Sequence, residues 1–158
     1  GGSEYVAKKI NILVVEPGQP PRPAQVEATL KTFEKVVGGP VEIGCFLPQR
    51  VLLVGQEDGK QRGLPPNREN PQEGDYIAGT FMLCGFEDDS FISLTPAQQM
   101  EFQSRFAKPG EFMMVGADKV CARPEELVGE VCRLWNSLPN GQSVVLTKWG
   151  GPERGVTV

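Results

Sequence analysis

The chain has 158 residues, a net charge of −4 and an isoelectric point of about 5.0. Its 39% hydrophobic and 23% charged residues are ordinary for a globular protein and exclude wholesale disorder. The length fits one domain with a small addition. Because nucleic-acid binding draws much of its affinity from a basic face, the acidic balance argues against a dedicated nucleic-acid binder.

The sequence predicts neither a membrane span nor a signal peptide. No apolar run approaches the roughly 18 residues that cross a bilayer, and the first residues are polar. The cysteines lie at irregular spacing, mostly within apolar runs, which is typical of reduced thiols. They are Cys45, Cys84, Cys121 and Cys132. We therefore expect a cytoplasmic protein, and nothing in the sequence predicts its oligomeric state.

A strand and a helix are predicted first. Residues 9–15 are β-branched and mostly apolar, and the turn at Glu16-Pro17-Gly18 ends this strand. Apolar residues then recur at helical spacing from about Pro23 to Val37. The pair Gly38-Gly39 supplies the stop signal of that helix.

The middle of the chain predicts strands separated by a stiff loop. Residues 41–47 and 51–56 form two short apolar runs, and residues 64–72 follow as a loop whose prolines fix its shape. The apolar stretch of residues 75–86 predicts a central strand. Gly79 within it indicates a bulge or a close approach of the backbone.

Two further helices are predicted. Thr95 and Gln98 form a capping box at the start of a helix that runs to about Phe106. A possible short strand follows at residues 112–115. Pro124 then begins a helix whose spacing places Trp135 on its apolar face.

A last strand at residues 143–149 completes the element order β-α-β-β-(β)-β-α-(β)-α-β. Short connections between strands predict an α+β fold with a mixed, mainly antiparallel sheet and with helices packed on one face. We expect an α+β domain over residues 8–107. Residues 108–150 would form a helix-strand extension on the same core, and residues 151–158 a flexible tail.

The sequence contains no histidine. This absence excludes Ser-His and Cys-His nucleophilic pairs and histidine-liganded metal sites. The cysteines lack the paired spacing of a zinc site. We therefore expect no metal, no cofactor and no catalytic residue, and we favour a binding protein over an enzyme.

The loop at residues 65–68 is the main candidate for binding. Prolines stiffen this loop. The Arg68 guanidinium could bind an anionic group, and the Asn67 amide could form hydrogen bonds with polar atoms of a ligand. Arg62 adds positive charge nearby. Two alternatives stay open, since Arg68 could instead pair with a neighbouring carboxylate, and Glu16 could be either a cleft residue or a solvated one.

Several segments, taken in chain order, resemble one bacterial domain family. They are Val14–Gly18, Val37–Glu42, Gly63–Arg68 and Gly74–Phe81. The family has no known function and is carried on conjugative elements, plasmids and phages. The resemblance covers about residues 9–107 and implies no activity. It implies that the protein is encoded by an accessory gene on a mobile element.

The leading hypothesis is a non-catalytic accessory protein that binds a protein partner or a small anionic ligand through Pro65–Arg68. The ligand-binding candidates are Glu16, Arg62, Asn67, Arg68 and Thr80. One alternative is a carboxylate- or metal-assisted hydrolase centred on Glu16. A second is a weak nucleic-acid binder that uses the cations Arg50, Lys60, Arg62, Lys148 and Arg154.

Overall fold

The computed structural model describes residues 8–71, 74–116, 119–149 and 153–157. The chain divides into two compact units, the first unit at residues 1–109 and the second unit at residues 110–158. Each unit is described by itself.

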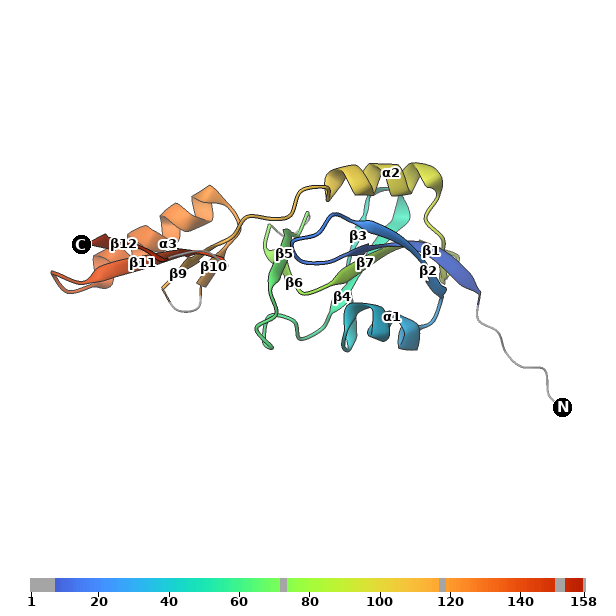
Figure 1. Cartoon of the computed structure of the whole chain (residues 1–158), viewed down its shortest axis with the longest axis horizontal. Coiled ribbons are helices and arrows are strands. Elements are labelled where there is room, and N and C mark those ends of the chain that lie inside the picture. Colours follow the sequence, from blue (N-terminus) through green and yellow to red (C-terminus); the bar gives the residue numbers. More distant parts are fainter. Residues whose placement is uncertain (1–7, 72–73, 117–118, 150–152, 158) are drawn as a thin grey trace. The chain divides into compact units, whose positions relative to one another are not determined.

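The first unit is built on one six-stranded sheet (Figure 1). Its strands follow the order β2 (Arg22–Glu27), β1 (Lys9–Val15), β7 (Phe81–Glu87), β4 (Val51–Gln56) and β3 (Val41–Leu47). The short strand β8 (Ser90–Ile92) pairs with the second half of β7. Every strand pair among the described residues is antiparallel, in agreement with the predicted class.

The two helices of the first unit cover opposite faces of this sheet (Figure 1). Helix α1 (Leu30–Val37) buries Phe33 and Val37 on one face, and α2 (Pro96–Arg105) buries Phe102 on the other. The expectation that the helices share one face is therefore wrong. The central strands are apolar on both sides, so each face needs a cover.

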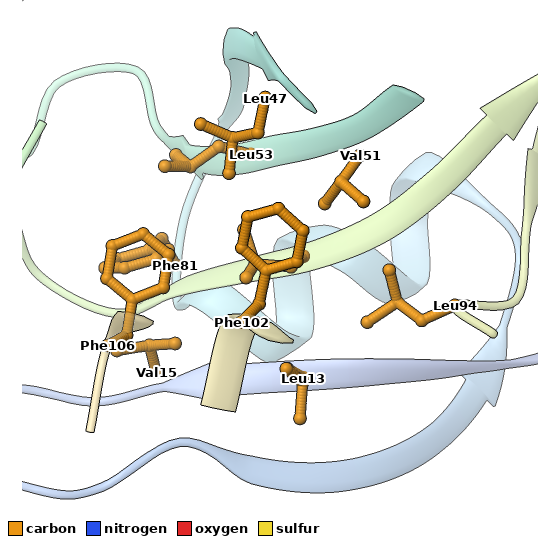
Figure 2. Packing of buried hydrophobic residues seen from close by; sticks show 10 residues of the cluster. Leu13, Val15, Leu47, Val51, Leu53, Phe81, Leu94, Phe102 and Phe106 are labelled. Carbon is orange, nitrogen blue, oxygen red and sulfur yellow. The ribbon is translucent and has the colours of Figure 1, made fainter. Parts of the chain in front are cut away.

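Alternation along the central strands divides the core into two clusters. In β1, Ile12 and Val14 point toward the face of α1, while Leu13 and Val15 point toward the face of α2. Figure 2 shows the second cluster, in which Phe102 and Phe106 lie over the side chains of the sheet. The Phe81 and Phe106 rings meet edge to face at 5.4 Å.

Strand β2 replaces the first half of the predicted helix. Arg22–Glu27 pairs with β1 as an edge strand, and the helix begins only after Thr29, whose side chain accepts from the Thr32 N–H. Pro23 cannot donate to a helix or to a central strand, but an edge strand tolerates it. The apolar spacing at Val26 therefore belonged to a strand rather than to a helix.

The predicted start of α2 is confirmed. Thr95 accepts from the Gln98 N–H at 3.1 Å, and the Gln98 side chain accepts from the Thr95 N–H at 2.8 Å. Gln98 also donates to the main-chain oxygen of Gln49 in the turn η1 (Pro48–Arg50), which joins β3 to β4. The capping residue thus holds the helix and this turn together.

The predicted strand at residues 75–86 divides in two at Gly79. Its first part, β6 (Tyr76–Ala78), forms a small hairpin with β5 (Pro66–Glu69), and its second part is β7. Gly79 has φ +80, and a Cβ there would lie 2.8 Å from Leu64 Cδ1. The positive φ explains why a glycine stands here, but the atoms nearest to that Cβ belong to side chains and do not show the predicted close approach of another backbone segment.

The second unit is a four-stranded antiparallel sheet with one helix, α3 (Pro124–Ser137). The strand order is β10 (Lys119–Cys121), β9 (Met113–Val115), β11 (Ser143–Lys148) and β12 (Glu153–Thr157). Its buried residues Val115, Cys121 and Val144 form a hydrophobic cluster within this unit.

Two expectations for this unit differ from the structure. Residues 153–157 pair with β11 as β12, so this part of the expected tail is a strand. Trp135 was expected in the core, but 39% of its surface is exposed. The residues of α3 that pack against the cluster are instead Leu127, Val131 and Leu134. Among the helices described, none is long and apolar enough to span a membrane.

Candidate functional site

The predicted binding pair, Asn67 and Arg68, lies inside the first unit. Asn67 is 1% exposed and Arg68 is 3% exposed. The Asn67 side-chain amide donates to the Val15 and Gly79 carbonyls, each at 2.9 Å. Its oxygen accepts from Arg68 Nη1 at 2.8 Å. Asn67 therefore ties the end of β1 to the link between β6 and β7.

Arg68 extends the same network to the turn after β1 and to the end of α2. Its guanidinium donates twice to the Phe106 carbonyl, at 3.1 and 2.9 Å, and also to the Gln19 carbonyl. Burial lowers the pKa of Arg68, although an arginine stays protonated at any working pH. We name Asn67 and Arg68 the brace. Its donors point at main-chain oxygens, which corrects the expectation of a ligand-gripping loop.

The other predicted site residues do not join the brace in one cavity. Glu16 lies on the surface and accepts from Arg22 Nε at 2.8 Å. Arg62 donates to the Gln56 side chain at 2.7 Å and lies 3.7 Å from an Asp58 carboxylate oxygen. Thr80 is half-buried in the link before β7. The first strand's turn and the Asn-Arg loop do meet, but through the carbonyls of Val15 and Gln19.

A cavity of about 410 Å³ lies elsewhere in the first unit, and we name it the β3–β4 cavity. Leu53, Gly44 and Gly55 belong to its floor, on the face of the sheet that α2 also covers. The nearest atom to the place where a Cβ on Gly55 would stand is Phe81 Cβ, at 3.8 Å. Gly55 therefore leaves open a space that a larger side chain would fill, whereas a Cβ at Gly44 would already lie 3.2 Å from Leu53 Cδ2.

One wall of the β3–β4 cavity comes from β6 and another from the turn that follows β4. Tyr76, Ile77 and Ala78 supply the first wall. In the turn, a Cβ on Gly59 would lie only 2.7 Å from the Ala78 carbonyl oxygen. The turn therefore approaches β6 so closely that only a glycine fits there.

The charges around the β3–β4 cavity are mainly negative. Glu42, opposite Gly55 in the register, and Glu57 are exposed carboxylates without an ion pair in the part of the chain that the structure describes. The one lysine of the lining, Lys60, pairs with Asp75, and its ammonium lies 4.6 Å from the centre of the Tyr76 ring. The arrangement thus presents two carboxylates to a bound molecule.

Sequence reasoning missed this cavity. Glu42 and Glu57 lie 15 positions apart and in no motif, and only the register of β3 with β4 brings them to one place. The available signal was the glycine content of these strands, since Gly44 and Gly55 interrupt apolar runs. Such glycines mark a place where something approaches the backbone closely.

No described residues offer a metal centre, because no group of three or more acidic or cysteine side chains could hold an ion. The buried thiols are poor nucleophiles. Burial raises the pKa of Cys84 to about 12 and also raises the pKa of Cys121. The side chains of Cys45 and Arg154 lie outside what the structure describes.

A family model described as "Domain of unknown function (DUF3846)" matches residues 10–107 of the chain. The chain belongs to the DUF3846 family. The resemblance noted over residues 9–107 is therefore confirmed as membership of a family without known function. No curated protein and no solved structure matches the chain.

The DUF3846 match coincides with the structural unit that contains the brace. It ends one residue after Phe106, whose carbonyl accepts two hydrogen bonds from Arg68. All residues that line the β3–β4 cavity also lie within the match. Helix α3 and the sheet of the second unit lie outside it.

Proposed function

We propose that this DUF3846 domain is a non-catalytic binding domain whose ligand is a small molecule with a positively charged amine. The ligand would occupy the β3–β4 cavity, with its amine between Glu42 and Glu57. The proposal rests on one observation: these two carboxylates border a cavity of about 410 Å³ and have no cation partner among the described residues. Cavities of ligand size fall between roughly 300 and 1,000 Å³.

The other residues of the lining support a cation rather than an anion. Lys60, the cation nearest the cavity, is already neutralised by Asp75. The side chain of Gln56 is occupied, since it donates to the Val37 carbonyl and accepts from Arg62. An anionic ligand would therefore meet two carboxylates and no available ammonium, at a cost in Coulomb energy. This replaces the anionic ligand expected from the sequence.

The lining of the cavity contains neither a histidine nor a cysteine, and this supports binding without turnover. The chain has no histidine, and Cys84 is fully buried beneath α1 rather than at the cavity. Glu16, the residue of the alternative hydrolase, pairs with Arg22 on the surface. Of the cations proposed for nucleic acid, Lys60 and Arg62 are each paired with a carboxylate. No specific observation therefore favours the hydrolase or the nucleic-acid binder.

Calorimetric titration with spermidine at physiological salt tests the proposal. We expect saturable binding to the intact chain, with glutarate giving no heat of binding. The double variant Glu42→Gln/Glu57→Gln should weaken spermidine binding by about tenfold or more, because a charge-assisted hydrogen bond contributes roughly 1.5–3 kcal/mol. Gly55→Val should also weaken it by filling the floor of the cavity.

Glu34→Gln is the matched control, because Glu34 is an exposed carboxylate on α1, which covers the opposite face of the sheet. It should leave spermidine binding unchanged. If Glu34→Gln weakened spermidine binding as much as the double variant does, net charge alone would explain the effect. That result would overturn the assigned site. A failure of spermidine, agmatine and arginine to bind at millimolar concentration would overturn the amine ligand itself.

We further propose that the gene is an accessory gene of a mobile element. The support for this setting is the resemblance of the four sequence segments to proteins of such elements. Sequencing the DNA that flanks the gene tests it: genes for conjugation, plasmid maintenance or phage assembly are expected nearby. Flanking genes of ordinary metabolism only would contradict it.

A further inference from the structure

The second unit contains a cavity of its own, of about 570 Å³. It lies beside the beginning of α3 and is lined largely by apolar groups, among them Phe112, Met113, Cys121 and Leu127. We name it the α3 cavity. Nothing in the DUF3846 match concerns it, because that match ends at residue 107.

Strand register explains how this cavity arises. Met113 of β9 lies opposite Cys121 on β10 and opposite Lys148 on β11, so these three residues form one row across the sheet. The row points to the face that α3 covers, since Cys121 and Val115 belong to the same cluster as Leu127 of the helix. Helix α3 begins only at Pro124 and leaves this end of the face uncovered.

The apolar floor of the α3 cavity is well buried. Phe112 and Cys121 are each 3% exposed. Burial is also the main reason why the pKa of the Cys121 thiol is raised, with the Glu126 carboxylate as a second cause. Because these two residues expose little surface, the gain on binding would come mainly from the apolar surface of the ligand itself, at roughly 25 cal/mol per Å² removed from water.

The rim of the α3 cavity has an excess of positive charge. Arg123 and Lys148 lie in the lining together with one carboxylate, Glu111. Lys148 is exposed at the end of its strand and has no ion pair among the described residues. Glu126 is engaged elsewhere, because its carboxylate accepts from the Ala122 N–H at 2.9 Å. A negative group at the rim would therefore meet an available ammonium.

The geometry points to a binding site for a small amphipathic carboxylate, with its hydrocarbon part over Met113 and Cys121 and its carboxylate at Lys148. The positive charge of Lys148 favours an anionic group, and the apolar lining favours a hydrocarbon chain. This site does not depend on the amine site of the first unit. The two can therefore succeed or fail separately.

Decanoate is the probe, and decanol and decyltrimethylammonium are its neutral and cationic counterparts. Titration into the full chain should show saturable binding of decanoate, with binding of the other two weaker by about tenfold. Lys148→Gln should weaken decanoate by a similar factor. Lys119→Gln is the control, because Lys119 is an exposed lysine of the same sheet that does not line the cavity.

Thiol labelling locates the bound decanoate independently of affinity. Cys121 lies at the floor of the α3 cavity, whereas Cys132 is exposed on α3. Decanoate should slow the reaction of Cys121 with iodoacetamide at pH 9 several-fold and leave Cys132 unchanged. Equal binding of decanol would overturn the role of Lys148. Binding without protection of Cys121, or no saturable binding at all, would overturn the site.

Discussion

Arg68 donates a hydrogen bond to the side-chain oxygen of Asn67 at 2.8 Å, and neighbours in sequence thus act as one buried unit. Together they reach four main-chain carbonyls outside the pair, at Val15, Gln19, Gly79 and Phe106. These carbonyls come from the end of β1, the turn after it, the link between β6 and β7, and the end of α2. The brace therefore fixes one end of the fold.

Arg68→Met should destabilise the protein by about 3 kcal/mol, because it leaves the buried Phe106 carbonyl without its donors. Urea denaturation followed by far-ultraviolet circular dichroism measures this change. Arg62→Met is the control, since Arg62 is exposed and should change the free energy of unfolding by no more than about 0.5 kcal/mol. Similar losses in the two variants would contradict the structural role of Arg68.

The Cys84 thiol should make stability depend on alkaline pH. Its pKa is raised by burial from 9.0 to about 12, so the unfolded chain releases this proton first as the pH rises. The thiol's contribution to the free energy of unfolding is fully present below pH 9. It is lost between pH 9 and about 12, by at most about 1.4 kcal/mol per pH unit. Urea unfolding at several pH values measures it.

Cys84→Ala supplies the comparison for that titration. It lowers stability at every pH because it leaves a cavity, but it removes the thiol's share of the slope above pH 9. Identical slopes in the wild type and in Cys84→Ala would show that the thiol is not protected in the folded protein.

Gly59→Ala should destabilise the first unit by about 2 kcal/mol, because the new Cβ would lie 2.7 Å from the Ala78 carbonyl oxygen. Gly129→Ala is the matched control, since no atom lies within 4 Å of a Cβ at that position of α3. There we expect a gain of roughly 0.5–1 kcal/mol. Thermal unfolding compares the two, and a neutral Gly59→Ala would disprove the close approach of the turn to β6.

Thr95→Ala should cost about 1 kcal/mol, the usual value for the loss of an N-cap. Gln98→Ala should cost at least as much, because Gln98 also holds the Gln49 carbonyl. The double variant should lose less than the sum of the single losses, since both residues belong to one capping box. Strict additivity in chemical denaturation would mean that the box is not formed.

Local chemistry made several elements predictable. The capping box at Thr95 and the stop at Gly38 depend on residues within one helical turn, and both are where the sequence placed them. The Arg22–Glu27 strand was not predictable in this way. Ala24 and Val26 alternate with Gln25 and Glu27, but two such positions in six residues are too short a pattern to outweigh the helical spacing that continues to Val37. Pairing with β1 along the whole register decides that the segment is a strand.

The candidate sites depend even more strongly on contacts between distant parts of the chain. Asn67 and Arg68 read as a binding loop because an exposed loop is the usual place for such side chains. Their burial follows from contacts 38 to 52 positions away, with Phe106, Gln19 and Val15, which no local pattern reports. Glu42 and Glu57 likewise acquire a shared role only through strand pairing.

The sequence alone determined the α+β class, the helix boundaries that rest on capping, and the exclusion of histidine chemistry. These depend on residue identity and on spacing within a few positions. Tertiary structure alone decided which face each helix covers, that Arg68 serves the fold, and where a cavity borders carboxylates that have no ion pair among the described residues. Those outcomes depend on which distant backbone oxygens and strands come together, and burial assigns each polar group its partner only then.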